Sequence, residues 1–256
     1  MTVRRELVMG RSVLHWARAF VMVAVPLVGC TDVSEFRTYR FIVTESLPDL
    51  TARASEGVEI CEADTDNCVT TGFGRADLEV PSNQEVTFTL EKEGFGPLLI
   101  ADVSDEAFGG LGDGGPAFLR MYPHDQLAAI AAQLQTPYPW EGGIVALATV
   151  PDLAGVTFTP VGSTIEMVGE PFYFDEPNDQ YSLDLEATTV AAGDGALILP
   201  LGAGGFTEVA PEEQQFELGG TAGDCARAFA WPGDAPNTIR VPVREGYTTY
   251  GIMFCD

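Results

Sequence analysis

Among the side chains that could act in catalysis or bind a metal, carboxylates are abundant in this chain, whereas histidine and cysteine are scarce. It holds thirty-eight acidic residues but only two histidines and five cysteines among 256 residues. A general base that works near neutral pH is most often histidine, and His124 is the only histidine after residue 29. It sits beside a glycine-rich stretch at the start of an expected helix, and no GxSxG nucleophile motif occurs in the chain. A histidine-based zinc site cannot be built from one histidine. We therefore expect no catalytic residues, no metal site and no cofactor.

Four cysteines, Cys61, Cys68, Cys225 and Cys255, form two near pairs along the chain. An even number of cysteines in an exported protein indicates disulfides, and four allow three connectivities. We expect the local pairing, Cys61 with Cys68 and Cys225 with Cys255. A zinc site made from the same four side chains is disfavoured because no CxxC occurs.

Two acidic segments could supply oxygen ligands for Ca²⁺. The first lies between Cys61 and Cys68 and contains Asp64, Asp66 and Asn67, and the second runs over 175–179. Neither has the glycine and distal glutamate of an EF-hand loop, so a solvated hairpin tip is the preferred interpretation. Carboxylate pairs of the kind that hydrolyse glycosides stay possible, but so many acids supply pairs by abundance alone. Trp140 and Trp231 could form a sugar-binding face, although aromatic residues in β-sandwiches more often belong to the core.

The first 29 residues have the order of an export signal. Arg4, Arg5, Arg11 and Arg18 precede the uncharged run Ala19–Gly29, which is shorter than the roughly 20 residues that span a bilayer. Leu27-Val28-Gly29-Cys30 resembles the bacterial lipobox. This resemblance implies that residues 1–29 are removed, that Cys30 carries the lipid, and that the protein is exported and anchored in the membrane. Because Thr31 stands where inner-membrane retention usually shows Asp, it also implies the outer membrane. The alternative is an uncleaved anchor with a buried free Cys30.

The net charge of residues 30–256 limits the classes of partner that this part of the chain can bind. Residues 1–29 contain four of the thirteen basic residues and one of the acidic ones, so nine basic and thirty-seven acidic residues remain, with a formal net charge of −28. Such a surface repels phosphate backbones, and we expect no nucleic acid among the partners. It also disfavours docking on anionic lipids, which leaves the acyl chains as the contact with the membrane.

The chain should be mainly β. Strands are expected at 39–43 and 57–61, and alternation of apolar and polar residues predicts strands at 76–80 and 85–90. Strands resume at 144–150, 156–159, 172–174, 196–199, 215–218, 239–243 and 248–254. The glycine-rich stretch 109–115 marks a linker. One helix is expected near 121–136, with Pro123 in its first turn.

Parts of this pattern recur. Gly57-Val58, Thr70-Thr71 and Gly74 to Pro81 are echoed by Gly155-Val156, Thr188-Thr189 and Gly193 to Pro200. This order of motifs, with Lys92-Glu93-Gly94-Phe95 as a closing turn, resembles that of the carboxypeptidase regulatory-like (prealbumin-like) domain. The resemblance implies two prealbumin-like β-sandwich domains joined by the glycine-rich linker and one short helix. The expected divisions are a signal peptide (1–29), a tether (30–38), a first sandwich (39–105), linker and helix (106–140), and a second sandwich (141–256).

The resemblance also implies a role. Such domains are non-catalytic accessory or adhesion modules of envelope proteins, so we expect a non-enzymatic interaction or structural module that binds protein or polysaccharide. The alternative is a carboxylate-dependent glycan hydrolase, or an accessory subunit of one.

The lipid anchor can be tested directly. Cells that express the chain and are fed a clickable fatty acid should label it, and Cys30→Ala should abolish the label because the thiol that accepts the lipid is gone. Cys68→Ala is the matched control, since it removes a cysteine outside the lipobox and should leave labelling intact. Equal labelling of the Cys30→Ala variant and the unchanged chain would exclude lipidation at Cys30.

Overall fold

A computed structural model describes ten stretches of the chain. They are residues 36–47, 51–104, 116–150, 156–161, 170–174, 190–192, 197–199, 203–220, 225–235 and 237–255. The predicted signal peptide, Cys30, the glycine-rich stretch 109–115 and the acidic cluster 175–179 lie outside these residues.

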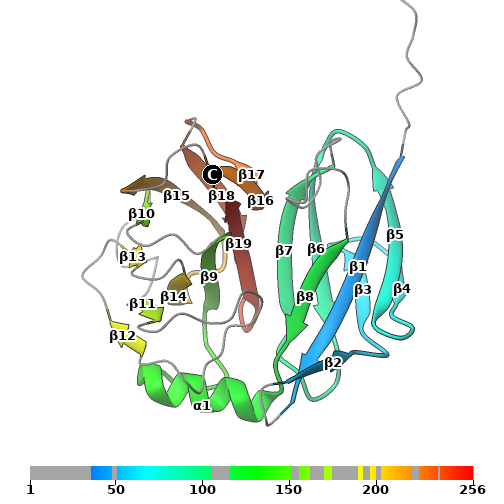
Figure 1. Cartoon of the computed structure of the whole chain (residues 1–256), viewed down its shortest axis with the longest axis horizontal. Coiled ribbons are helices and arrows are strands. Elements are labelled where there is room, and N and C mark those ends of the chain that lie inside the picture. The colour runs from blue at the N-terminus through cyan, green and yellow to red at the C-terminus, as the bar shows by residue number, and fades with distance from the viewer. Residues whose placement is uncertain are drawn as a thin grey trace, which may run out of the picture. The chain divides into compact units, whose positions relative to one another are not determined.

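The described part is mainly β with one short helix, as the sequence predicts (Figure 1). The elements up to the helix are β1 (Phe36–Ser46), β2 (Ala52–Ala54), β3 (Glu59–Glu62), β4 (Cys68–Thr70), β5 (Arg75–Pro81), β6 (Glu85–Glu91), β7 (Leu98–Val103), β8 (Ala117–Met121) and α1 (His124–Leu134). They are followed by β9 (Gly143–Val150), β10 (Val156–Pro160), β11 (Glu170–Phe174), β12 (Val190–Ala192), β13 (Leu197–Leu199), β14 (Ala203–Val209), β15 (Glu213–Gly220), β16 (Ala226–Phe229), β17 (Trp231–Pro232), β18 (Thr238–Pro242) and β19 (Thr248–Phe254).

These strands form three sheets among the described residues. A four-stranded sheet has the order β2-β1-β5, with β8 also paired to β1. A five-stranded sheet has the order β13-β10-β15-β18-β17. The ten-stranded sheet has the order β12-β11-β14-β9-β19-β7-β6-β3-β4, with β16 also paired to β19. Several sheets of this kind are consistent with β-sandwich architecture.

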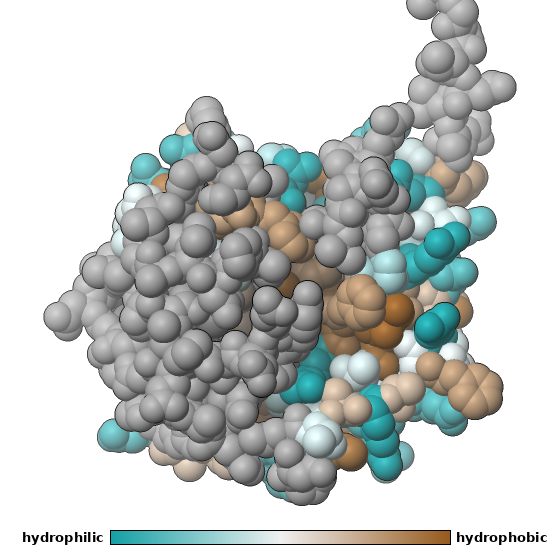
Figure 2. Space-filling model, in the orientation of Figure 1, coloured by the Kyte–Doolittle hydropathy of each residue, from teal (hydrophilic) through white to brown (hydrophobic). Residues whose placement is uncertain are grey.

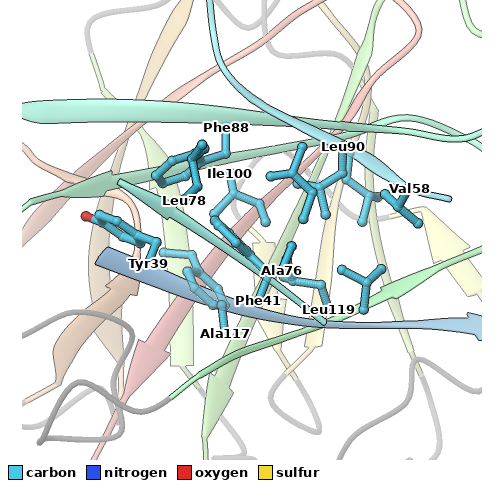
Figure 3. Close-up of a cluster of buried hydrophobic side chains, with 14 of the residues drawn as sticks. Tyr39, Phe41, Val58, Ala76, Leu78, Phe88, Leu90, Ile100, Ala117 and Leu119 are labelled. Atoms are coloured by element: carbon cyan, nitrogen blue, oxygen red, sulfur yellow. The ribbon is translucent and has the colours of Figure 1, made fainter. Parts of the chain in front are cut away.

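The first core lies between the four-stranded sheet and the part of the large sheet formed by β3, β6 and β7 (Figure 3). Alternation sends every second side chain of β1 inward, so Tyr39, Phe41 and Val43 are buried while Arg40 is exposed. The rings of Tyr39 and Phe41 meet the ring of Phe88 from β6 at centroid distances of 4.7 and 5.2 Å. These contacts pack the two sheets against each other around one hydrophobic core.

A second core lies between the five-stranded sheet and the strands β9, β14 and β19 of the large sheet. Phe206 of β14 stacks on Phe216 of β15, with ring centroids 5.3 Å apart. Both rings are buried, as is Phe158 of β10. The aromatic side chains of this half therefore fill its interior.

Helix α1 begins at His124, directly after Pro123, and ends where Gln135 adopts a left-handed conformation. The backbone N–H of Gln135 bonds back to the carbonyls of Ala131 and Ala132, which satisfies the open end of the helix. Leu127, as expected from its helical spacing, is among the buried residues that pack with Trp140 in a third cluster. The predicted helix near 121–136 is thus confirmed, within a few residues at each end.

The two segments predicted as separate sandwiches share one sheet. Strand β19 pairs in parallel with β7 of the first segment and with β9 of the second. Residues Ser34–Asp256 form one compact unit. The domain boundaries drawn from the sequence stay a prediction, but backbone hydrogen bonds connect the two segments directly.

The sequence repeat does not become a repeat of strand pairing. In the first copy, β3 and β5 belong to different sheets. In the second copy, the corresponding strands β10 and β13 pair antiparallel with each other. The repeated residues specify strands and turns locally, while their partners are chosen by contacts far along the chain.

A tight turn at residues 72–75 connects the segment that contains Thr70-Thr71 to strand β5. Gly72 and Arg75 exchange both backbone hydrogen bonds, and Phe73 and Gly74 have φ of 51° and 72°. This is the two-residue turn with positive φ at both central positions, which favours glycine. A Cβ on Gly74 would lie 2.7 Å from the carbonyl oxygen of Val43. Gly74 is therefore needed both for its conformation and for its lack of a side chain.

We predict that Gly74→Ala destabilises the protein more than Gly57→Ala does. Gly57 has the same φ of 72° but open space around the added Cβ, so its substitution should cost only the conformational term of about 1–2 kcal/mol. The Gly74 variant should add the clash with Val43 to that term. Urea unfolding of both variants measures the difference, and equal losses would show that the close approach is relieved without cost.

Candidate functional site

The four cysteines form the two local disulfides that the sequence predicts. Cys61 is bonded to Cys68, and Cys225 to Cys255. The first bridge joins directly opposite residues of β3 and β4, and Cys68 is exposed. The second ties the entry of β16 to the residue after β19, and Cys255 is buried. None of the four is a free thiol, and two disulfides are typical of an exported, oxidising environment.

His124 is exposed at the first position of α1. Its Nδ1 contacts the hydroxyl of Tyr138, whose ring packs edge-on against Trp140 at a centroid distance of 4.8 Å. Burial raises the pKa of Tyr138, so this hydroxyl stays protonated at neutral pH. The side-chain partner of His124 is thus a neutral phenol, which suits a residue at the start of a helix.

The acidic hairpin tip between Cys61 and Cys68 is engaged in protein contacts. Asp64 accepts a hydrogen bond of 2.7 Å from Arg244, and the Asn67 amide donates to Glu62 and to the Glu79 carbonyl. Within the stretches that the structure describes, no group of three or more His, Cys, Asp or Glu side chains could hold a metal ion. The second acidic segment, 175–179, lies outside those stretches.

The two tryptophans do not form a shared exposed face. Trp140 is 4% exposed and belongs to the cluster around α1. Trp231 donates its Nε1–H to the carbonyl of Val86 at 3.1 Å, and the guanidinium of Arg240 lies over its ring. Both side chains serve packing between elements of the fold.

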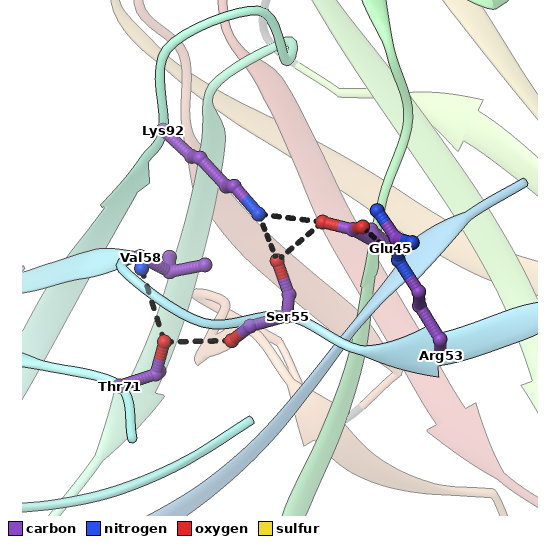
Figure 4. Close-up of polar contacts among 6 residues, drawn as sticks. All are labelled: Glu45, Arg53, Ser55, Val58, Thr71 and Lys92. Carbon is purple, nitrogen blue, oxygen red and sulfur yellow. Dashed lines mark hydrogen bonds and ion pairs between the residues drawn. The ribbon is translucent and has the colours of Figure 1, made fainter. Parts of the chain in front are cut away.

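A buried carboxylate at the end of the first sandwich was not expected from the sequence (Figure 4). Glu45 of β1 is 3% exposed. Its oxygens accept hydrogen bonds from Lys92 at 2.5 Å, from Ser55 at 3.1 Å, and from Arg53. The backbone behind Ser55 is held in turn by Thr71, whose hydroxyl donates to the Ser55 carbonyl. Each charge in this cluster therefore has a partner.

The pKa of Glu45 follows from these contacts. Burial by itself raises the pKa of the carboxyl, whereas the hydrogen bonds from its three donors and the positive charge of Lys92 lower it. The net result is a pKa below the ordinary value for glutamate. Glu45 is thus an anion at neutral pH, and its charge is required by the cations around it.

Lys92 and Ser55 have a spacing that could suggest nucleophilic catalysis, since Lys92 Nζ lies 3.0 Å from Ser55 Oγ. A Ser–Lys pair needs a neutral amine and a hydroxyl that substrate can reach. Here Lys92 forms an ion pair with Glu45, and Ser55 is fully buried. The geometry suits a structural role in closing the end of the sandwich.

The opposite side of the same sheet faces outward and carries a distinct surface. We call it the outer face and define it by Arg40, Ile42, Arg75, Phe118 and Arg120. Strand pairing places them together, because Ile42 is opposite both Arg75 of β5 and Phe118 of β8. Phe118 is 57% exposed. Figure 2 shows hydrophobic residues gathered over the region where Figure 1 places β1 and β8, with hydrophilic residues around them.

Positive charge is concentrated on this sheet. Nine basic residues follow Cys30, and five of them belong to β1, β2, β5 and β8: Arg37, Arg40, Arg53, Arg75 and Arg120. The chain as a whole has a net charge of −25. A sheet surface that combines arginine with exposed phenylalanine is therefore unlike the acidic composition of the molecule as a whole.

Two local signals point to these sites in retrospect. Glu45 has the same parity as Tyr39, Phe41 and Val43 in an alternating strand, which predicts that its carboxylate points inward. Phe118 alternates with buried Ala117 and Leu119 in β8. That strand is only five residues long and lies next to the glycine-rich stretch, so its pattern is easily missed.

No protein-family model matches the chain, and no curated protein matches it. Among the described residues, no helix is long and apolar enough to cross a membrane. The resemblance to carboxypeptidase regulatory-like domains thus stands without a matching family.

Distant likeness to solved structures of bacterial proteins was found. The TIE protein of Bacillus anthracis is 11% identical, with a TM-score of 0.23, over 86% of this chain and 34% of that one. The major pilin protein of Streptococcus pyogenes is 8% identical, with a TM-score of 0.23, over 87% and 100% of the two chains. A streptococcal ancillary pilin is 9% identical, with a TM-score of 0.21, over 88% and 63%. This chain spans about a third of the first of these proteins, and such values assign no family.

Glu45→Gln should destabilise the protein at neutral pH by about 3 kcal/mol, because the buried cations lose their charged partner. A lowered pKa contributes stability above the unfolded value of about 4.3 and loses it as pH falls through the folded value. The difference between the two proteins should therefore shrink below pH ~4. Urea unfolding at a series of pH values measures it.

Arg53→Met is the control for that prediction. The Arg53 side chain is 66% exposed, so losing its ion pair should cost less than about 1 kcal/mol. A Glu45→Gln effect that is equally small, or that does not change with pH, would show that the cluster contributes no net electrostatic stability.

Proposed function

We propose that this chain is a lipid-anchored protein of the cell envelope whose folded part acts as a non-catalytic interaction module. The observation that carries the proposal is the outer face, where exposed Phe118 and half-buried Ile42 stand among three arginines on a strongly acidic molecule. Contiguous exposed apolar side chains that are rimmed by polar residues mark interaction sites. Aromatic residues and arginine are also the side chains enriched at the centres of protein interfaces.

The location in the envelope is supported by two independent features. Both disulfides suit an oxidising compartment. The basic, apolar and Leu-Val-Gly-Cys30 order suits processing to a lipoprotein. Placement in the outer membrane, attachment through the Cys30 lipid, and membership of the prealbumin-like sandwiches remain part of the proposal. A partner in the envelope, protein or polysaccharide, would meet the outer face at the membrane surface.

A non-catalytic role is supported by the state of the reactive groups. His124 contacts a phenol, Ser55 is buried, and the four cysteines after Cys30 are paired. The alternative, a carboxylate-dependent glycan hydrolase, gains nothing from Glu45, which is screened from solvent and bound to cations. Between the two candidate partners we favour protein, because phenylalanine together with arginine is typical of the centres of protein interfaces.

Site-specific cross-linking in cells tests the proposal. A photoreactive phenylalanine analogue at position 118 should form an adduct with an envelope protein, and Arg120→Glu should suppress that adduct by reversing the local charge. The same analogue at Phe73, which is 83% exposed at the turn outside the outer face, is the matched control and should not form it. Identical results at the two positions would contradict the proposal. So would turnover of a glycan, ester or peptide that disappears when one Asp or Glu is changed.

A further inference from the structure

Strand β8 lies at the edge of the four-stranded sheet. Residues Ala117–Met121 pair in parallel with Phe41–Glu45 of β1, and β1 is the only strand neighbour of β8 among the described residues. In the described stretches, no backbone hydrogen bond outside the strand pairs joins residues 117–121 to another segment. Among the described residues, the second edge of β8 therefore has no strand partner, and an unpaired edge is a template for an added strand.

The edge that β5 forms in the same sheet is protected from strand addition. Strand β5 ends in Pro81, and the carbonyl of Glu79 accepts a hydrogen bond from the side chain of Asn67. Proline and side-chain caps of this kind block strand addition. Strand β8 contains no proline and no bulge. Strand β2 at another end of this sheet has only three residues, so β8, with five, is the longer edge without such a block.

The side chains of β8 define what an added strand must carry. Ala117, Leu119 and Met121 are buried inward, so Phe118 and Arg120 alone face outward. Cross-strand neighbours interact directly in a sheet. A strand next to β8 would place one outward residue beside Phe118 and the next outward residue beside Arg120. An apolar residue suits the first position and an acidic residue suits the second.

Charge and backbone chemistry decide the class of partner. On the outer face Asp77 lies opposite Arg40, whereas Arg120 of β8 lies opposite Thr44, so Arg120 keeps a positive charge available to anions along the β8 edge. A second copy of this chain brings a net charge of −25 and is repelled at long range. An anionic polysaccharide could satisfy the arginines but not the amide and carbonyl groups of an open strand edge. Only a polypeptide offers both an acidic side chain and a matching backbone.

We propose that β8 binds an extended acidic segment of a partner protein by strand addition, with Phe118 and Arg120 selecting an alternation of apolar and acidic residues. This inference rests on the proposed function and names the partner class and the binding mode at the same face. Main-chain hydrogen bonds to β8 supply the affinity, and the two outward side chains supply the selectivity.

The test uses the full-length chain in detergent and a fluorescent Glu/Val alternating peptide of about seven residues, a usual strand length. Fluorescence anisotropy should show binding that weakens at high salt. Arg120→Glu should weaken binding about tenfold or more and favour a Lys/Val peptide, because the charge selection is reversed. Phe73→Ala, which removes an exposed ring away from β8, should leave binding unchanged.

Backbone pairing is tested separately with two N-methylated versions of the peptide. One is methylated on the odd residues and the other on the even residues. A strand directs the amides of alternate residues to opposite edges, so one version should lose binding about tenfold or more while the other keeps it. Circular dichroism of Arg120→Glu confirms that the variant is folded.

Several results would overturn strand addition. They are equal binding of both methylated peptides, equal binding of the Glu/Val and Lys/Val peptides, no binding of any peptide, or displacement of the peptide by polygalacturonate at equal charge. An Arg120-dependent dimer in sedimentation experiments would make a second copy the occupant. In each case the cross-linking at position 118 still tests the proposed function independently, so the two failures are distinguishable.

Discussion

The constraint on which the described fold depends is the position of its last strand. β19 is paired in parallel with β7 on one side and with β9 on the other. Both pairings are parallel and therefore cannot be made by local hairpins. The large sheet is complete only when the C-terminal seven-residue strand is in place. Folding of the first segment thus depends on residues about 150 positions further along the chain. Contacts over such long sequence separations make folding slow.

Side chains reinforce this junction from the same region of the chain. Trp231 donates to the Val86 carbonyl, and Arg240 pairs with Glu85. Beyond β18, Arg244 reaches Asp64 in the disulfide hairpin. Most of these contacts are partly exposed, so their individual contributions are modest. Their common effect is to fix how the end of the chain lies along the first sandwich.

The closing turn Lys92-Glu93-Gly94-Phe95 has a clear physical use. Gly94 has a φ of 84°, and the Phe95 N–H bonds to the Lys92 carbonyl, which makes a tight turn that needs glycine at its third position. The Lys92 ammonium then lies over the Phe95 ring and binds Glu45. A buried pair of this kind gives little net stability, but an unpaired member is costly. The turn and the carboxylate therefore depend on each other.

The outer face carries the opposite charge to the carboxylate that the same strand buries. Within one strand, β1 directs Glu45 inward to cations and presents Arg40 outward in a chain of net charge −25. Alternation makes both possible with a spacing of a few residues. The same strand therefore contributes to the stability of the sandwich and to the surface by which we propose the protein binds its partner.

Local chemistry in the sequence was sufficient for the strands with clear alternation, such as β5 and β6, for the short helix, and for the disulfides between near neighbours. These features depend on residues within a few positions of each other. It was not sufficient for β7, whose residues are buried on both faces and so do not alternate. The strand partners of the repeated segments, the inward environment of Glu45 and the open edge of β8 were also decided only in the folded chain. Each of them depends on which distant strand lies alongside, and a period of two residues carries no information about that neighbour.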